Sequence, residues 1–298
     1  MLCGNRLKYV DVFYTYTMSR CQRLSLLNPP ETHHQKQSNP NRETQRKIVF
    51  LSPRGGTGKS SLIANISVNL ALKGLKIGIA DLDLKGPSLN TMFNIDENGF
   101  RLNDFLLGRC SASSCVIDLT KQLNLRKGGL FLLPASLHTT DILNIYEKGY
   151  NIDGLTLGLI NMVNDLGLDF LLIDTPSGLD EDVLISMLMG DHAVILTRPD
   201  SQSRAGTNAI INFLRKLGYG EKGRSISLII NYVPPACDAE EVRDEFERTY
   251  GYPVLAVVPF YADVFTNTNR EVFSSKEPRH PFSAKVNEIS EKLLNRLF

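Results

Sequence analysis

The stretch PRGGTGKSS, residues 53–61, decides the fold. It follows an apolar run at 48–52 that is typical of a strand, and it opens a segment at 59–73 that is typical of a helix. Glycines let the backbone bend around an anion, so that successive N–H groups and the helix N-terminus point at phosphate oxygens. A strand, a glycine-rich loop and a helix in this order indicate a phosphate-binding loop.

The residues of this loop predict a nucleotide site. Lys59 is placed to bridge the β and γ phosphates, and the hydroxyl of Ser60 is placed to bind Mg²⁺. A glycine-rich turn with a surface lysine is the alternative, which the full string and its flanks disfavour. The residues expected to contact nucleotide in the loop are Gly55, Gly56, Thr57, Gly58, Lys59, Ser60 and Ser61.

Beyond the loop, short apolar runs alternate with helical segments. This pattern predicts an α/β fold with a mostly parallel central sheet of about seven strands and helices on both faces. The strands are expected at 48–52, 76–81, 130–134, 170–174, 192–197, 225–231 and 254–258. We expect residues 47–298 to form a single domain.

Net charge, cysteine content and the length of apolar runs limit the partners and the cellular compartment that we expect. The 298 residues have a net charge of +1, which implies no attraction of the whole protein to polyanions. Five scattered cysteines suit a reducing compartment, so we expect a cytoplasmic protein. No apolar run approaches the roughly 20 residues that span a bilayer. Residues 1–46 lack an apolar period in their second half, and we expect a disordered or extraneous extension there.

Acidic residues end two of the expected strands. Asp81 and Asp83 follow the second strand, at the sheet edge where ligands bind in α/β folds. Asp174 ends the apolar run FLLID and precedes Thr-Pro-Ser-Gly, which is a Walker B arrangement. A buried strand would fix Asp174 so that it holds a magnesium-bound water. Turn-forming aspartates are the alternative interpretation of the first pair.

The loop resembles that of the ParA/MinD branch of P-loop ATPases, which reads Lys-Gly-Gly-x-Gly-Lys-Ser/Thr and often lacks the leading glycine. This chain has Arg54 at the first lysine position. In that family the early lysine reaches the phosphates of a partner protomer, so the resemblance implies a catalytic role in trans for Arg54. A planar guanidinium suits contact with paired phosphate oxygens. A solvent-facing arginine is the alternative.

The resemblance extends to other segments of the site. Asp83 matches the acid that orients the attacking water, and Asp81 the one that supports the magnesium shell. Asp174 begins the family's Asp-x-Pro-x-Gly segment. Asn231 matches an asparagine that reads the adenine edge, and backbone near Pro259 would complete that pocket; the alternative for Asn231 is a turn before two prolines.

The resemblance implies an ATPase that binds Mg-ATP, forms a homodimer in the ATP state and hydrolyses slowly when an activating protein binds. Such proteins act as spatial positioning switches. Two alternatives stay open. One is an iron–sulfur carrier like the Mrp proteins, suggested by Gly86, Pro87 and Ser88, although only Cys237 lies in the half of the chain where a cysteine pair is expected. The other is a nucleotide-dependent adaptor that does not hydrolyse ATP.

Two helices bear on further partners. The helix at 201–217 has a core-facing stripe of Ala205, Ala209, Ile210, Phe213, Leu214 and Leu217. The helix at 283–298 is amphipathic, and packing on the core is favoured over membrane binding because acidic residues dilute its basic face. Lys216, Lys222 and Arg224 are candidates for a DNA-binding stripe, with a solvated face as the alternative.

Overall fold

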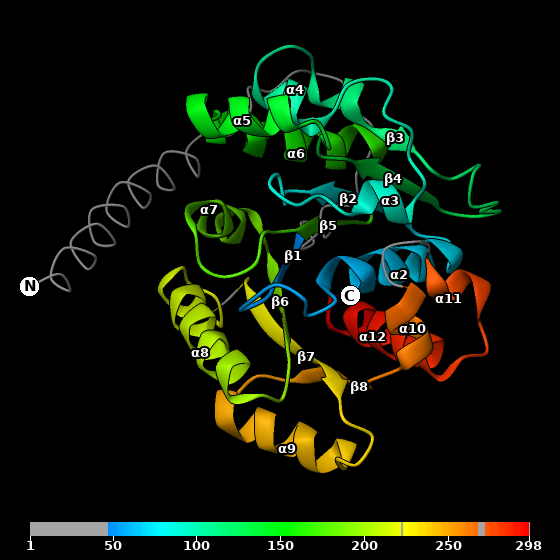
Figure 1. The fold of residues 1–298 in the computed structure, drawn as a ribbon, viewed down its shortest axis with the longest axis vertical. Coiled ribbons are helices and arrows are strands. Elements are labelled where there is room, and N and C mark those ends of the chain that lie inside the picture. Colours follow the sequence, from blue (N-terminus) through cyan, green and yellow to red (C-terminus); the bar gives the residue numbers. More distant parts are fainter. Residues whose placement is uncertain (1–46, 222, 268–271, 298) are drawn as a thin grey trace, which may run out of the picture. The chain divides into compact units, whose positions relative to one another are not determined.

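The computed structural model describes residues 47–221, 223–267 and 272–297. They form an eight-stranded sheet in the order β3-β4-β2-β5-β1-β6-β7-β8 (Figure 1). Every neighbouring pair is parallel except β3 with β4. The strands are β1 Lys47–Leu51, β2 Lys76–Asp81, β3 Ile117–Asp118, β4 Gly129–Leu133, β5 Phe170–Asp174, β6 His192–Thr197, β7 Ser225–Val233 and β8 Val254–Pro259. The predicted α/β class is confirmed; the extension expected at 1–46 lies outside the described residues.

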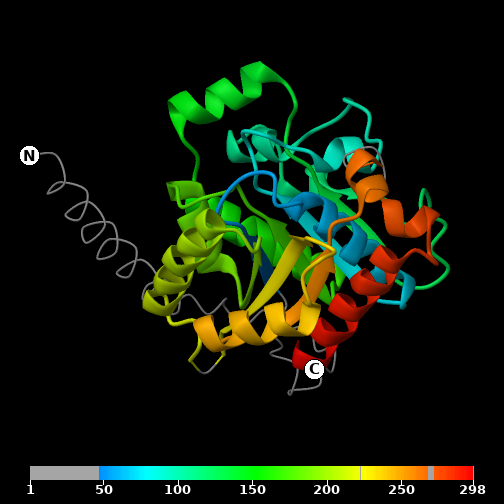
Figure 2. The ribbon, with the colours of Figure 1, turned by 60° about the horizontal axis from the view of Figure 1, so that its bottom comes forward.

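Helices cover both faces of the sheet. Helices α2 and α12 lie side by side on one face, and α7, α8 and α9 line the other (Figure 2). The helices are α2 Lys59–Leu72, α3 Leu89–Met92, α4 Leu102–Leu106, α5 Thr139–Lys148, α6 Ile152–Leu166, α7 Glu181–Met189, α8 Ser201–Lys216, α9 Ala239–Tyr250, α10 Ala262–Asn267, α11 Phe273–Lys276 and α12 Pro281–Leu297, with a 3₁₀ turn, η1, at Ala112–Cys115. No described helix is long and apolar enough to span a bilayer.

The strands divide the core into two apolar layers. Side chains alternate along a strand, so Ile48 and Phe50 of β1 join the layer that contains α2 and α12. Val49 and Leu51 join the layer beneath α6 to α9. Both layers are buried, which is why the central strands are apolar at successive positions. This double burial fixes the carboxyl ends of β1, β2 and β5, where the site lies.

The structure differs from the sequence-based expectation at one edge strand and one helix face. The strand β3 has two residues, too few to give a pattern in the sequence. On α8 the exposed Ala205 was wrongly placed in the core. Thr207 faces the sheet instead, because its hydroxyl lies 2.8 Å from both the Thr197 hydroxyl and the Ser203 carbonyl oxygen. A polar side chain is buried there because it has hydrogen-bond partners.

The C-terminal helix packs on the core, as the favoured interpretation predicts. Val286, Ile289 and Leu293 are fully or almost fully buried against α2 and β8. The apolar face of α12 is therefore covered by its own domain.

Candidate nucleotide-binding site

A cavity of about 380 Å³ lies at the carboxyl ends of the central strands. Its lining is made by the loop between β1 and α2, residues 54–61, together with Ser52, Asp83, Ser88, Ser177, Tyr232 and Phe265. The order of the strands places β1 between β5 and β6, so this loop emerges from the middle of the sheet. The structure thus brings together the predicted phosphate loop and Asp83.

Glycine is required at two positions of the loop. Gly56 and Gly58 have φ angles of 72° and 84°, in the left-handed region that glycine favours. A Cβ at Gly58 would lie 2.7 Å from Asn231 Nδ2 and 2.8 Å from Tyr232 Oη. Two side chains of β7 therefore crowd this position, which adds to the preference for glycine that the φ angle sets.

Lys59 begins α2 and lies on the floor of the cavity. Its side chain is only 6% exposed, and its ammonium forms an ion pair with Asp174 and donates to the Thr175 carbonyl oxygen. The Thr175 hydroxyl in turn donates to the Phe50 carbonyl oxygen at 2.7 Å, which ties the end of β5 to β1. The position of the lysine is thus set by two buried strands.

Two buried carboxylates lie next to Lys59, at the carboxyl ends of β2 and β5 behind the cavity lining. Asp81 and Asp174 lie opposite each other in the register of β2 and β5. In the described structure, Oδ2 of each is buried without a hydrogen-bond partner. Burial raises the pKa of Asp81 well above its usual value, and the negative charges of Asp174 and Asp83 raise it further. We call Lys59, Asp81 and Asp174 the floor.

These unpaired oxygens fit a magnesium ion. Buried carboxylate oxygens need a cation or a donor, and Mg²⁺ prefers oxygen ligands and retains water. The Ser60 side chain lines the same cavity and offers a hydroxyl. In the described residues no group of three or more histidine, cysteine or acidic side chains is arranged as a metal site. A nucleotide bound in the cavity would bring phosphate oxygens as further ligands for such an ion.

Asp83 lies in a tight turn above the floor. Its backbone N–H donates to Asp81 Oδ1 at 3.2 Å, and its carboxylate accepts the Gly86 N–H at 3.2 Å. Burial raises the pKa of Asp83, although Lys59 acts in the opposite direction. The turn directs a carboxylate of raised proton affinity toward the cavity.

The two residues predicted for adenine lie together in a second, water-sized cavity. Its volume is about 10 Å³, and both Asn231 and Pro259 line it. Asn231 Nδ2 donates to the Thr57 carbonyl oxygen at 2.8 Å. The asparagine therefore also holds the phosphate loop, a contact that the sequence did not predict.

Tyr232 is a site residue that sequence reasoning missed. It lines both cavities, and its φ of 56° is unusual for a bulky residue. Its ring meets those of Phe260 and Phe265 edge to face, each with centroids 6.0 Å apart. A left-handed tyrosine has no signal in the sequence, because glycine and asparagine are the residues expected in this conformation.

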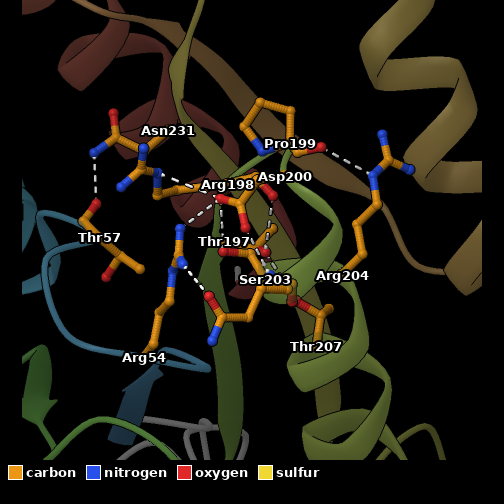
Figure 3. A network of polar contacts seen from close by, with 11 residues as sticks. Arg54, Thr57, Thr197, Arg198, Pro199, Asp200, Ser203, Arg204, Thr207 and Asn231 are labelled. Carbon is orange, nitrogen blue, oxygen red and sulfur yellow. Dashed lines mark hydrogen bonds and ion pairs between the residues drawn. The ribbon is translucent and has the colours of Figure 1, made fainter.

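Arg54 lies at the outer edge of the cavity and turns toward its own protomer. Its guanidinium contacts Asp200 Oδ2 at 2.6 Å and Gln202 Oε1 at 2.7 Å (Figure 3). In this conformation Arg54 is partly exposed, paired with side chains of its own protomer, and not directed at the floor.

The cysteines and basic residues considered for an iron–sulfur cluster or for DNA lie in different parts of the fold. Sγ atoms of Cys110 and Cys115 lie 3.3 Å apart, with Cys115 buried, and Cys237 is exposed. Arg224 donates to the carbonyl oxygens of Leu217 and Leu188 and so also holds the fold together; its place in a DNA-binding stripe stays a prediction. Lys222 lies outside the described residues.

Comparisons with known proteins agree with this geometry. The family model for the NUBPL iron-transfer P-loop NTPases of the ParA group matches residues 43–294. The cytosolic Fe-S cluster assembly factor CFD1 of Kluyveromyces lactis is 30% identical over 225 residues, 73% of this chain and 75% of that protein. The septum site-determining protein MinD of Neisseria meningitidis is 26% identical over 258 residues, 84% of this chain and 90% of that one.

Solved structures have the same fold. The cell division ATPase MinD of Pyrococcus furiosus has a TM-score of 0.69 at 24% identity, covering 85% of this chain and 99% of that chain. MinD of Pyrococcus horikoshii, complexed with Mg-ADP, has a TM-score of 0.67 at 24% identity, covering 83% and 95%. With the family model matching most of the chain, this protein belongs to the ParA family of P-loop NTPases.

Proposed function

We propose that this chain binds Mg-ATP in the 380 Å³ cavity, pairs with a second copy in the ATP state and hydrolyses ATP slowly as a molecular switch. The observation that carries the proposal is the floor. A buried lysine there lies beside two buried carboxylate oxygens without partners, directly beneath a loop built to hold phosphate.

The floor is arranged for an exchange of partners. Lys59 would turn from Asp174 to the β and γ phosphates, which leaves the Asp174 carboxylate free to accept from a metal-bound water. Ser60 would give its hydroxyl to Mg²⁺, and Asp81 would support the ligand shell from beneath. When bound, the ion would neutralise charge on the phosphates. The backbone N–H groups of 55–59 would hold the phosphate oxygens.

Asp83 is placed to orient water. Phosphoryl transfer needs positioning and charge neutralisation more than a strong base. A carboxylate fixed by the Gly86 N–H can orient a water by accepting a hydrogen bond from it. Substituting Asp83 would then stop hydrolysis without preventing nucleotide binding.

Pairing of two copies is the part that depends on Arg54. In this proposal each Arg54 reaches the phosphates bound by the partner protomer, where a permanently charged fork adds charge-assisted hydrogen bonds. An activating protein would accelerate hydrolysis. Membrane or DNA could serve as the surface on which such a switch acts.

Light scattering after gel filtration, with and without ATP and Mg²⁺, tests the proposal. We expect the wild type to dimerise with ATP, Lys59→Ala to stay monomeric, and Asp83→Ala to stay dimeric without releasing phosphate. Lys73→Ala is the matched control, because this lysine at the other end of α2 pairs with Glu291 at the surface. A wild type that gives no heat with millimolar ATP, while it unfolds cooperatively, would overturn the proposal. Dimers that never release phosphate would identify the non-hydrolysing adaptor.

Handling of an iron–sulfur cluster is a second candidate, favoured by the family model and by CFD1. Paired thiolates are the ligands such a cargo requires. Cys110 and Cys115 are the close pair in the described chain. Anaerobic reconstitution with iron and sulfide, followed by visible absorbance, tests it in the wild type, Cys110→Ser/Cys115→Ser and Cys237→Ser. A colourless wild type excludes this cargo.

A further inference from the structure

Arg54 makes two contacts within its own protomer. Its Nη2 lies 2.6 Å from Asp200 Oδ2, and its Nη1 lies 2.7 Å from Gln202 Oε1. Both partners belong to the start of α8, more than a hundred residues away in the sequence, and Figure 3 shows the guanidinium directed at Asp200. A guanidinium in this position is not extended away from its own subunit.

Asp200 is held firmly in place. It caps α8, because its Oδ1 accepts the Ser203 N–H at 2.9 Å. Its Oδ2 also accepts the Ser203 hydroxyl at 3.0 Å. The preceding carbonyl, that of Pro199, accepts from Arg204 Nε at 3.0 Å. The carboxylate is therefore a fixed acceptor for Arg54.

Arg54 is not fully hydrogen-bonded in its contact with Asp200 and Gln202, and a second cation lies near Asp200. Both features allow Arg54 to leave. Arg54 Nε is buried without a hydrogen-bond partner in the described structure, so the guanidinium is not fully satisfied where it lies. Arg198 Nε is 3.6 Å from the same Asp200 oxygen. If Arg54 leaves, Arg198 stays to balance the carboxylate, and Asp200 is not left as an isolated charge.

We propose that Asp200, with Gln202, is a positioning group that holds Arg54 in cis as a latch, and that pairing of two ATP-loaded copies opens both latches. The inference rests on the proposed function, in which Arg54 acts across the dimer. We use latch for Arg54, Asp200 and Gln202. Asp200 then sets how readily the dimer forms without touching the nucleotide.

The expected size of the effect follows from exposure. The Arg54 and Asp200 side chains are 31% and 36% exposed, and an ion pair at such a site changes an equilibrium by a factor of about 1.5 to 5. Each dimer opens two latches, so the factors multiply. Asp200→Asn should therefore lower the dimer dissociation constant by roughly 2- to 25-fold at saturating ATP.

Asp200→Asn is the most suitable variant, because asparagine caps a helix as well as aspartate does but carries no charge. Asp238→Asn is the matched control. Asp238 caps α9 through the Glu240 and Glu241 N–H groups, and within the described ranges it forms no ion pair. Sedimentation at saturating Mg-ATP gives the dimer dissociation constant. We expect a lower constant for Asp200→Asn and an unchanged one for Asp238→Asn.

A second measurement shows whether the contact exists before pairing. In nucleotide-free protein, the unfolding equilibria of Arg54→Ala, Asp200→Asn and the double variant form a thermodynamic cycle. The effects of the two substitutions on the unfolding equilibrium constant should be non-additive by a factor of about 1.5 to 5. A role of Asp200 in capping alone would give additive changes.

The two experiments distinguish failure of the latch proposal from failure of the proposed ATP-dependent function. The latch proposal is wrong if Asp200→Asn dimerises with the wild-type dissociation constant or more weakly. It is also wrong if the Arg54→Ala and Asp200→Asn effects on unfolding are additive. A wild type that fails to bind ATP in calorimetry overturns the proposed function instead. The cycle is measured without nucleotide, so it still reports the contact in that case.

Discussion

The floor and the latch place two cations of one loop in opposite situations. Lys59 is 6% exposed and lies between the ends of buried strands, whereas Arg54 is 31% exposed and lies against the start of a helix. The partners of Lys59 are fixed by the register of the sheet. Those of Arg54 are side chains brought near by α8. Both cations would exchange an aspartate for phosphate, but Lys59 would do so within its own protomer from a buried position, whereas Arg54 would do so across the dimer from a partly exposed one.

The largest expected effect is on ATP affinity, which should distinguish Lys59 from Arg54. Lys59→Ala removes charge-assisted contacts to phosphate, and each such contact is worth about 1.5–3 kcal/mol, so we expect ATP affinity to fall by roughly 100-fold or more. Arg54→Ala should change the affinity of the monomer by less than about threefold, because Arg54 acts only after pairing. Calorimetry at protein concentrations below the dimerisation range measures both.

Lys59→Ala leaves Asp174 buried without its ion-pair partner, and this can destabilise the fold. The double variant Lys59→Ala/Asp174→Asn removes both charges and is the control for folding. If the double variant folds and binds ATP as the wild type does, the assignment of the floor is wrong. Equal losses for Arg54→Ala and Lys59→Ala would erase the contrast between floor and latch.

The amino end of the same sheet sharpens the comparison, because among the described residues the buried His192 forms no ion pair and its hydrogen-bond partner is the neutral Ser225 hydroxyl. Burial, with the positive charge of Arg296, lowers the pKa of His192 from 6.5 to about 4. The native state keeps His192 neutral while the unfolded chain takes up a proton. Stability from this residue is therefore constant above pH 6.5 and falls between pH 6.5 and 4, by roughly 3 kcal/mol at most.

The His192 prediction is checked by denaturant unfolding from pH 7.5 to 4. His192→Gln should lose less stability than the wild type over the acid half of this range. His138→Gln, at an exposed histidine, should follow the wild-type curve. If His192→Gln and the wild type lose stability in parallel, His192 does not titrate as its burial requires.

The sequence predicted the floor better than it predicted the latch, for a physical reason. Ligand-binding loops and strand-end acids have local signatures, since Gly58, Lys59 and Asp174 each stand in a recognisable string. Contacts between distant side chains have none, so the partners of Arg54 were not foreseen. The left-handed Tyr232 was missed because its conformation is imposed by packing and not by local preference.

Substitution of Asn231 should have a smaller effect on nucleotide affinity. It tests whether this residue holds the phosphate loop, contacts the base, or does both. Asn231→Ala removes the hydrogen bond to the Thr57 carbonyl oxygen, worth about 1 kcal/mol, so nucleotide affinity should fall by roughly fivefold. Measured with ATP and GTP, an equal loss for both means that Asn231 only holds the loop. Loss of the preference for ATP means that it also reads adenine, as the family resemblance implies. An unchanged affinity for both contradicts either role.

Lys85 should give the smallest effect, and it tests whether exposed ion pairs at the edge of the cavity are weak in general. Lys85 Nζ lies 3.0 Å from Asp182 Oδ2 and 3.3 Å from Asp180 Oδ2, and its side chain is 42% exposed. An ion pair in this setting is screened by water, so Lys85→Met should cost less than about 1 kcal/mol of unfolding free energy.

The difference should also vanish in 1 M salt, where the screening length is about 3 Å. Lys121→Met, at an exposed lysine without a salt bridge in the described chain, is the control. A loss well above 1 kcal/mol that persists in salt would mean that the edge of the cavity is as rigid as the floor.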